Sequence, residues 1–163
     1  MKKTLLAALA FASLFVVFAS ARYATPADSR LGGKAPGFAL AEGDSATTRL
    51  QDYCGKYVLL TFWSSTDPQS RIANIKYDRA TRTDSTIAYV AINYDPSGAV
   101  YSEIVKRDSL AEASQHHDSA GTASRIYKAY GLTDGFTSVL IAPTGRIVAV
   151  DPTPGELAGI AAR

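Results

Sequence analysis

Short apolar runs alternate along the chain with segments whose apolar residues recur at helical spacing. The runs at 57–63 and 87–93 are almost entirely apolar and rich in β-branched and aromatic residues, which is typical of strands covered on both faces. Between them, residues 69–80 have the spacing of a modest amphipathic helix. Its expected apolar stripe consists of Ile72, Ile75, Tyr77 and Ala80. Strand, helix and strand in this order predict a right-handed parallel crossover.

The remaining pattern predicts further helices, a short strand and a hairpin. Apolar residues at helical spacing predict helices at 99–107 and 154–162. Residues 47–50 alternate enough to form a second short strand. Two apolar strands, at 139–142 and 146–150, flank a turn that contains a proline and a glycine, so we expect a hairpin there.

The N-terminus has the three zones of a secretory signal peptide. Residues 1–21 contain a basic start, an apolar run that ends at Phe18, and small residues before Arg22. We expect cleavage before Arg22 and export to the periplasm or the exterior. The alternative is a retained membrane anchor, although the apolar run is shorter than the ~20 residues that usually span a bilayer. Residues 22–33 predict a flexible linker, and the folded domain is expected at 34–163.

Charge and length narrow the classes of function. The chain has 17 Lys and Arg and 15 Asp and Glu residues, a formal net charge of +2, and two of its lysines lie in the expected signal peptide. The mature domain is therefore neutral, which argues against a nucleic-acid binder, since such a protein needs a basic surface. Its length of about 140 residues fits one domain with one core. The single cysteine, Cys54, cannot form a disulfide within its own chain.

The junction after the first apolar run combines the end of a strand, a polar turn and the start of a helix. Asp67 and Pro68 are a strong helix start, because Asp accepts N–H bonds as an N-cap and Pro needs no hydrogen bond at the first helical position. The simplest interpretation is a well-made cap. Unpaired N–H groups and the helix dipole also favour an anion there, and many active sites are built at such a junction. Asp67 would be that anion.

Several stretches resemble one family. Residues 55–65, with Gly-Lys, an apolar run and Phe-Trp-Ser-Ser, are similar to the strand that leads into the redox motif of TlpA/ResA-like thioredoxin-fold proteins, of the AhpC/TSA and thiol-disulfide oxidoreductase superfamily. The first strand, the Leu-x-Asp-x-x-Gly-Lys turn, the helix ending in Tyr-Gly and the final loop and strand of that family have counterparts at 34–40, 50–56, 124–131 and 136–141. The resemblance covers 34–163 and implies an α/β, thioredoxin-like fold with a central mixed β-sheet flanked by helices. Gly131 also fits a left-handed residue that ends the helix.

On this resemblance, three residues of the redox site are replaced. Asp67 takes the place of the first cysteine of the Cys-x-x-Cys pair, Ser70 that of the second, and Phe136 that of the cis-proline. A non-proline cis bond costs about 2.5–4 kcal/mol, so we expect a trans bond before Phe136 and an altered loop. Thiol-disulfide exchange needs an attacking and a resolving thiol, which Asp and Ser cannot supply. We therefore expect no catalytic residue at this site and no enzymatic activity.

The resemblance instead implies an exported, non-catalytic module that binds a protein or peptide partner and needs no cofactor. Its expected binding residues are Trp63, Thr66, Asp67, Pro68, Phe136 and Thr137. Trp63 has an alternative role, in which its ring only packs against the following helix. Apart from the signal peptide, we expect no contact with a membrane.

Three other functions compete with this interpretation. The first is a thiol-disulfide oxidoreductase or redox sensor that acts through Cys54 alone, although this thiol lacks the helix terminus and cationic setting of reactive thiols. The second is metal binding at His116 and His117. Adjacent histidines point in different directions and no second cluster has ligand spacing, so we expect a polar surface loop without metal. The third is a hydrolase using Asp67, Ser70 and a histidine, for which the spacing offers no triad.

Overall fold

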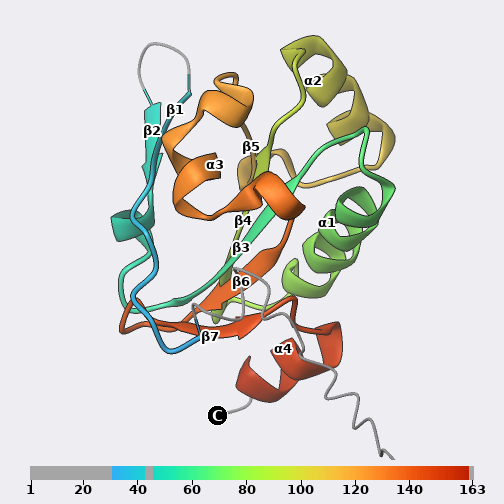
Figure 1. The fold of residues 1–163 in the computed structure, drawn as a ribbon. Helices are drawn as coiled ribbons and strands as arrows, with labels where there is room; N and C mark the ends of the chain where they lie inside the picture. The colour runs from blue at the N-terminus through green and yellow to red at the C-terminus, as the bar shows by residue number, and fades with distance from the viewer. Residues whose placement is uncertain (1–30, 43–45, 162–163) are drawn as a thin grey trace, which may run out of the picture.

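The computed structural model describes residues 31–42 and 46–161, and the expected signal peptide and most of the expected linker lie outside these ranges. A five-stranded sheet in the order β5-β4-β3-β6-β7 forms the centre of the domain (Figure 1). Its strands are β3 (Tyr57–Trp63), β4 (Ile87–Asn93), β5 (Gln115–His117), β6 (Ser138–Ile141) and β7 (Ile147–Val150). Because β3 pairs in parallel with β4 and antiparallel with β6, the sheet is mixed, as predicted.

Helices and a small hairpin cover the two faces of this sheet (Figure 1). The helices are α1 (Pro68–Thr81), α2 (Gly98–Arg107), α3 (Arg125–Ala129) and α4 (Pro154–Ala161). The first, second and fourth lie on one face, while α3 and the antiparallel pair β1 (Ala39–Glu42) and β2 (Ala46–Arg49) lie on the other. Within the described residues, every helix is too short or too polar to span a bilayer.

The central strand β3 is buried on both faces, which explains its unbroken apolar sequence. Leu60 and Phe62 belong to the core beneath α3 and β1, whereas Leu59 and Trp63 pack on the opposite face. Each of these four side chains is at most 1% exposed. Burying a side chain of this size stabilises the fold by about 1.5–3 kcal/mol, so β3 is the strand around which both halves of the core are built.

The face of α1 that meets the sheet is mostly polar, and the predicted apolar stripe of this helix is only half correct. Tyr77 is buried and Ile75 packs against the core beneath α2, but the other two residues face the solvent. Ile72 is 51% exposed, and Ala80 is exposed as well. The residues of α1 that are buried are Ser70, Asn74, Tyr77, Asp78 and Thr81. They recur three and four positions apart, so they lie on one side of the helix. Asn74, Tyr77 and Asp78 can be buried here because their side chains have hydrogen-bond partners on other elements.

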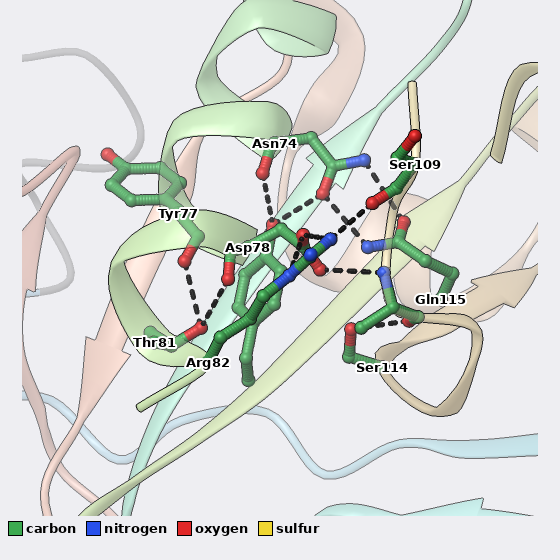
Figure 2. Close-up of polar contacts among 10 residues, drawn as sticks. Asn74, Tyr77, Asp78, Thr81, Arg82, Ser109, Ser114 and Gln115 are labelled. Carbon is green, nitrogen blue, oxygen red and sulfur yellow. Dashed lines mark hydrogen bonds and ion pairs between the residues drawn. The ribbon is translucent and has the colours of Figure 1, made fainter. Parts of the chain in front are cut away.

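Asn74 is at the centre of this polar interface (Figure 2). Its side chain is fully buried, and its amide exchanges two hydrogen bonds with the amide of Gln115 on β5, at 3.0 and 3.2 Å. The hydroxyl of Tyr89, on β4, donates to Asn74 Oδ1 at 2.5 Å. Buried polar groups are tolerated when they are paired in this way, so the network ties α1 to two strands.

One turn further along the helix, Asp78 places a carboxylate inside the protein (Figure 2). Its side chain is 1% exposed, and it accepts hydrogen bonds from Arg82 Nε at 2.9 Å and from the backbone N–H of Ala111 at 3.0 Å. Arg82 also donates to the backbone carbonyl of Ser109. This buried carboxylate is therefore both paired with a cation and hydrogen-bonded, and these partners offset the cost of burying it.

The other predicted elements agree with the structure, apart from the histidine pair. Helix α3 is followed by Gly131, which has the left-handed values φ 55° and ψ 47°. His116 and His117 do not lie in a surface loop as predicted, because they form the edge strand β5 with Gln115. His116 is 5% exposed there, since β5 pairs in parallel with the end of β4.

Candidate functional site

The turn between β3 and α1 has the predicted capped geometry. Asp67 has an extended backbone (φ −106°, ψ 104°), and its carboxylate accepts the backbone N–H of Ser70 at 2.7 Å. Pro68 occupies the first helical position. The N-cap prediction is confirmed, and the carboxylate at the helix N-terminus is turned toward the backbone of its own helix.

Ser70 occupies the second redox position and is also engaged in hydrogen bonds. Its side chain is buried, with 6% of the residue exposed. The hydroxyl donates to the backbone carbonyl of Asp67 at 3.2 Å and accepts the backbone N–H of Ser64 at 3.3 Å. At both positions where TlpA/ResA-like proteins carry a cysteine, this chain therefore has a side-chain oxygen that is hydrogen-bonded to nearby backbone groups.

Behind this turn, the buried carboxylate of Asp95 holds the loop in place. Its Oδ1 accepts the hydroxyl of Ser64 at 2.6 Å and the backbone N–H of Ser65 at 2.8 Å, and its Oδ2 accepts the side-chain amide of Asn93 at 3.1 Å. Burial of Asp95 opposes its ionisation, but these hydrogen bonds outweigh burial and hold the pKa of Asp95 below its ordinary value. Asp95 is thus a fixed negative charge that orders the loop.

The sheet register brings the Phe136 loop to the same end of β3. The backbone N–H of Phe62 donates to the carbonyl of Thr137 at 3.2 Å, so Phe136 and Thr137 lie beside the end of the strand that leads to Asp67. All peptide bonds of the described residues are trans, including the one before Phe136. The ring of Phe136 stacks on Tyr94, with ring centroids 6.1 Å apart and an interplanar angle of 12°. Tyr127 meets both rings edge-on.

Of the six predicted binding residues, one is buried in the core and five are exposed or half-buried. Trp63 is fully buried and packs in the small core beneath α2, with its ring 6.3 Å from that of Tyr101. Trp63 therefore packs in the core and does not contribute to the surface. Thr66 and Pro68 are exposed, and the other three are half-buried. We call these five residues the redox-position face: Thr66, Asp67, Pro68, Phe136 and Thr137.

The two histidines do not form a hydrolytic or metal site with these residues. His117 Nε2 lies 2.8 Å from the backbone carbonyl oxygen of Asp95, and its ring stacks on Tyr101 with centroids 5.2 Å apart. A triad would require that nitrogen to face a carboxylate or a hydroxyl nucleophile. In the part of the chain that the structure describes, no group of three or more His, Cys, Asp or Glu side chains is arranged to hold a metal ion.

Cys54 is exposed and lies at the far end of the same strand. It precedes β3, whereas Asp67 follows it, and β3 contains seven residues. A strand of this length spans about 20 Å at the usual rise per residue. The thiol and the redox-position face therefore cannot contact one substrate atom together.

The residues that sequence reasoning missed are the ones that support the site, chiefly Ser64, Asn93 and Asp95. A usable signal was present in the sequence. The runs at 57–63 and 87–93 were predicted to be parallel strands, and the carboxyl ends of parallel strands meet at one edge of a sheet. The polar residues after each run, Ser64-Ser65 and Asp95, could therefore have been placed together.

A mixed sheet with this strand order, flanked by helices and with α1 starting at the end of its central strand, defines a thioredoxin fold. In this chain the two redox positions of that fold carry oxygen in place of sulfur. No protein-family model matches the chain, and neither does any curated protein.

Solved structures do match. A thioredoxin-like protein from Parabacteroides distasonis is 30% identical, with a TM-score of 0.70 over 82% of this chain and 95% of that protein. A thiol-disulfide oxidoreductase from Bacteroides fragilis is 25% identical, with a TM-score of 0.66 over 78% and 98%. The thioredoxin domain of a thiol-disulfide oxidoreductase from Bacteroides vulgatus is 19% identical and shares the fold, with a TM-score of 0.66 over 81% and 95%. The chain belongs to the TlpA/ResA-like thioredoxin-fold family, as a member without the Cys-x-x-Cys pair.

Proposed function

We propose that this protein is an exported, non-catalytic thioredoxin-like module that binds a protein or peptide partner through the redox-position face. The observation that carries the proposal is the state of the two redox positions. Asp67 and Ser70 both use their side-chain oxygens in hydrogen bonds to local backbone groups. Neither side chain can attack a disulfide or resolve a mixed one, because both steps require a thiolate.

The same face has features that suit recognition. Phe136 is half-buried and rests on Tyr94, and Pro68 is exposed beside the Asp67 carboxylate. An aromatic ring held by its neighbours loses little conformational freedom on binding. A carboxylate next to apolar groups favours a partner segment that presents a cationic side chain beside an apolar one. Asp95 fixes the loop beneath this face, so the surface is formed before the partner arrives.

Turnover of insulin disulfides by dithiothreitol tests the non-catalytic part. Mature protein, freed of contaminating reductases, is expected not to raise the rate of insulin reduction above that of dithiothreitol alone. The Cys54→Ala variant is expected to behave in the same way. Catalysis by the wild type would refute the proposal. The change Asp67→Cys with Ser70→Cys restores the thiol pair and serves as the control that the assay responds to this fold.

Selection from a displayed peptide library tests the binding part. Asp67→Asn is the informative variant, because Asn caps a helix about as well as Asp and so removes the charge alone. We expect wild-type protein to enrich peptides with a basic and an apolar residue close together, and Asp67→Asn to lose them by about tenfold in affinity. The matched control, Glu103→Gln, neutralises an exposed carboxylate on α2. Equal loss in both variants, or enrichment of no motif, would contradict binding at this face.

A second candidate function is a redox sensor that forms a mixed disulfide through Cys54, and the exposure of this thiol favours it. The intact mass of protein purified from cells, with and without a reducing agent, separates this function from simple binding. A reducible adduct on Cys54 supports the sensor. The same spectrum tests export, because the loss of residues 1–21 is expected in the mature protein.

A further inference from the structure

A cavity of about 360 Å³ lies at the opposite end of β3 from the redox-position face. Its inner wall is apolar and contains the buried side chains of Ala35, Val58 and Ile141. Leu50 and Tyr53, both half-buried, form a second wall. The volume and the mainly apolar lining are those of a small-molecule site and fall at the small end of that class.

The walls of this cavity are held by backbone hydrogen bonds. The N–H of Ala35 donates to the carbonyl of Gly145 at 2.9 Å, and the N–H of Leu50 donates to the carbonyl of Phe38 at 3.3 Å. These bonds join three segments around the cavity: the N-terminal segment before β1, the segment between β2 and β3, and the β6–β7 turn. These hydrogen bonds hold the walls of the cavity together.

The charge at the rim of the cavity is positive. Lys34 and Lys56 both line it, and its lining includes no Asp or Glu. Neither lysine has an ion-pair partner among residues 31–42 and 46–161. Asp52, the nearest acidic residue in sequence to Lys56, has its carboxylate bonded to the backbone N–H of Arg49 at 2.7 Å. Two unpaired cations beside an apolar hollow favour an anion with an apolar body.

We propose that this cavity binds a small amphipathic carboxylate, with its apolar chain against Val58 and Ile141 and its carboxylate between Lys34 and Lys56. The site is separate from the redox-position face and does not depend on the function proposed for that face. Cys54 also lines the cavity and is exposed, so its thiol reports on occupancy. A bound ligand shields the thiol from a reagent that approaches from the solvent.

The experiment measures the rate at which N-ethylmaleimide, a neutral reagent, alkylates Cys54 in the full mature protein. Octanoate is the probe, and octylamine and octanol are controls of the same chain length. We expect octanoate to slow alkylation by the factor 1 + [L]/Kd, which is about tenfold when its concentration is about ten times Kd. Octylamine and octanol are expected to slow it less than about twofold at the same concentration.

Variants test which charges select the anion. Each variant is compared with itself, with and without octanoate, so that a change in the intrinsic reactivity of Cys54 cancels. Lys34→Gln with Lys56→Gln is expected to abolish the protection. The matched control, Lys76→Gln, removes an exposed lysine on α1 and is expected to keep it. The proposal is wrong if octanoate gives the wild type no protection, if octylamine or octanol protects equally, or if the double variant stays protected.

Discussion

Replacing Asn74 by Leu separates the contribution of the buried amide pair from that of ordinary packing. The substitution keeps approximately the same volume but removes the partner of both Gln115 side-chain atoms, which lie 3.0 and 3.2 Å from Asn74. Gln115 is 5% exposed, so water cannot replace the lost bonds. The Tyr89 hydroxyl keeps a second acceptor, the backbone carbonyl of Asn74 at 3.3 Å.

The magnitude follows from the two orphaned groups. Each buried polar group left without a partner costs about 1–3 kcal/mol, so Asn74→Leu is expected to lower the free energy of unfolding by about 2–6 kcal/mol. A domain of this size has about 5–15 kcal/mol in total, so the loss is large. Gln115→Leu is expected to cost less, about 1–3 kcal/mol, because it leaves Asn74 Nδ2 without a partner while Asn74 Oδ1 still accepts the Tyr89 hydroxyl. The double variant is expected to lie near the wild type, since replacing both partners by apolar groups is nearly neutral.

Urea unfolding followed by far-ultraviolet circular dichroism measures all four proteins of this double-mutant cycle. We expect a coupling energy of at least about 2 kcal/mol between the two positions. Lys76→Leu, on the exposed side of the same helix, is expected to change stability by less than about 0.5 kcal/mol. If the two single losses simply add in the double variant, the amide pair does not hold α1 to the sheet and the reasoning fails.

Three further outcomes are expected. Because the pKa of Asp95 is lowered in the folded protein, this group stabilises the fold above its ordinary pKa, and the stabilisation is lost as the pH falls toward the folded pKa. Asp95→Asn places an amide N–H₂ against the amide of Asn93 and should lower the free energy of unfolding by about 1–3 kcal/mol at pH 7. Urea unfolding between pH 7 and pH 3 should then show a smaller loss of stability on acidification than in the wild type. Thr153→Ala removes the hydroxyl that accepts the backbone N–H of Glu156 and should cost about 1 kcal/mol, with faster hydrogen exchange in α4, whereas Thr153→Ser should not. Cys54 should be alkylated in the native protein without denaturant, as read from intact mass; labelling only after unfolding would contradict its exposure.

The elements that depend only on interactions between residues close in sequence could be predicted from the sequence. The runs that form β3 and β4 are apolar because both faces are covered, so length and composition were enough to predict them. The cap at Asp67 and Pro68 could be predicted because its atoms lie within one turn of helix.

The polar face of α1 could not be predicted, because its partners are distant in sequence. Gln115 lies 41 residues from Asn74, and Ala111 lies 33 residues from Asp78. On a single helix the aliphatic residues are the expected buried side, and only the tertiary partners reverse that choice. The short strand β5 was missed for a related reason. Its three residues have no apolar pattern of their own, and they form a strand through pairing with β4.

The hydrogen-bonded oxygens at the start of α1 have a consequence for how the protein responds to its surroundings. An enzyme with a thiol pair at these positions exists in an oxidised disulfide form and a reduced dithiol form, and the two differ in shape and charge. Here the same atoms have one covalent state. A partner that docks at this surface would therefore be held with the same strength in oxidising and in reducing surroundings, and its release must be controlled by concentration or competition.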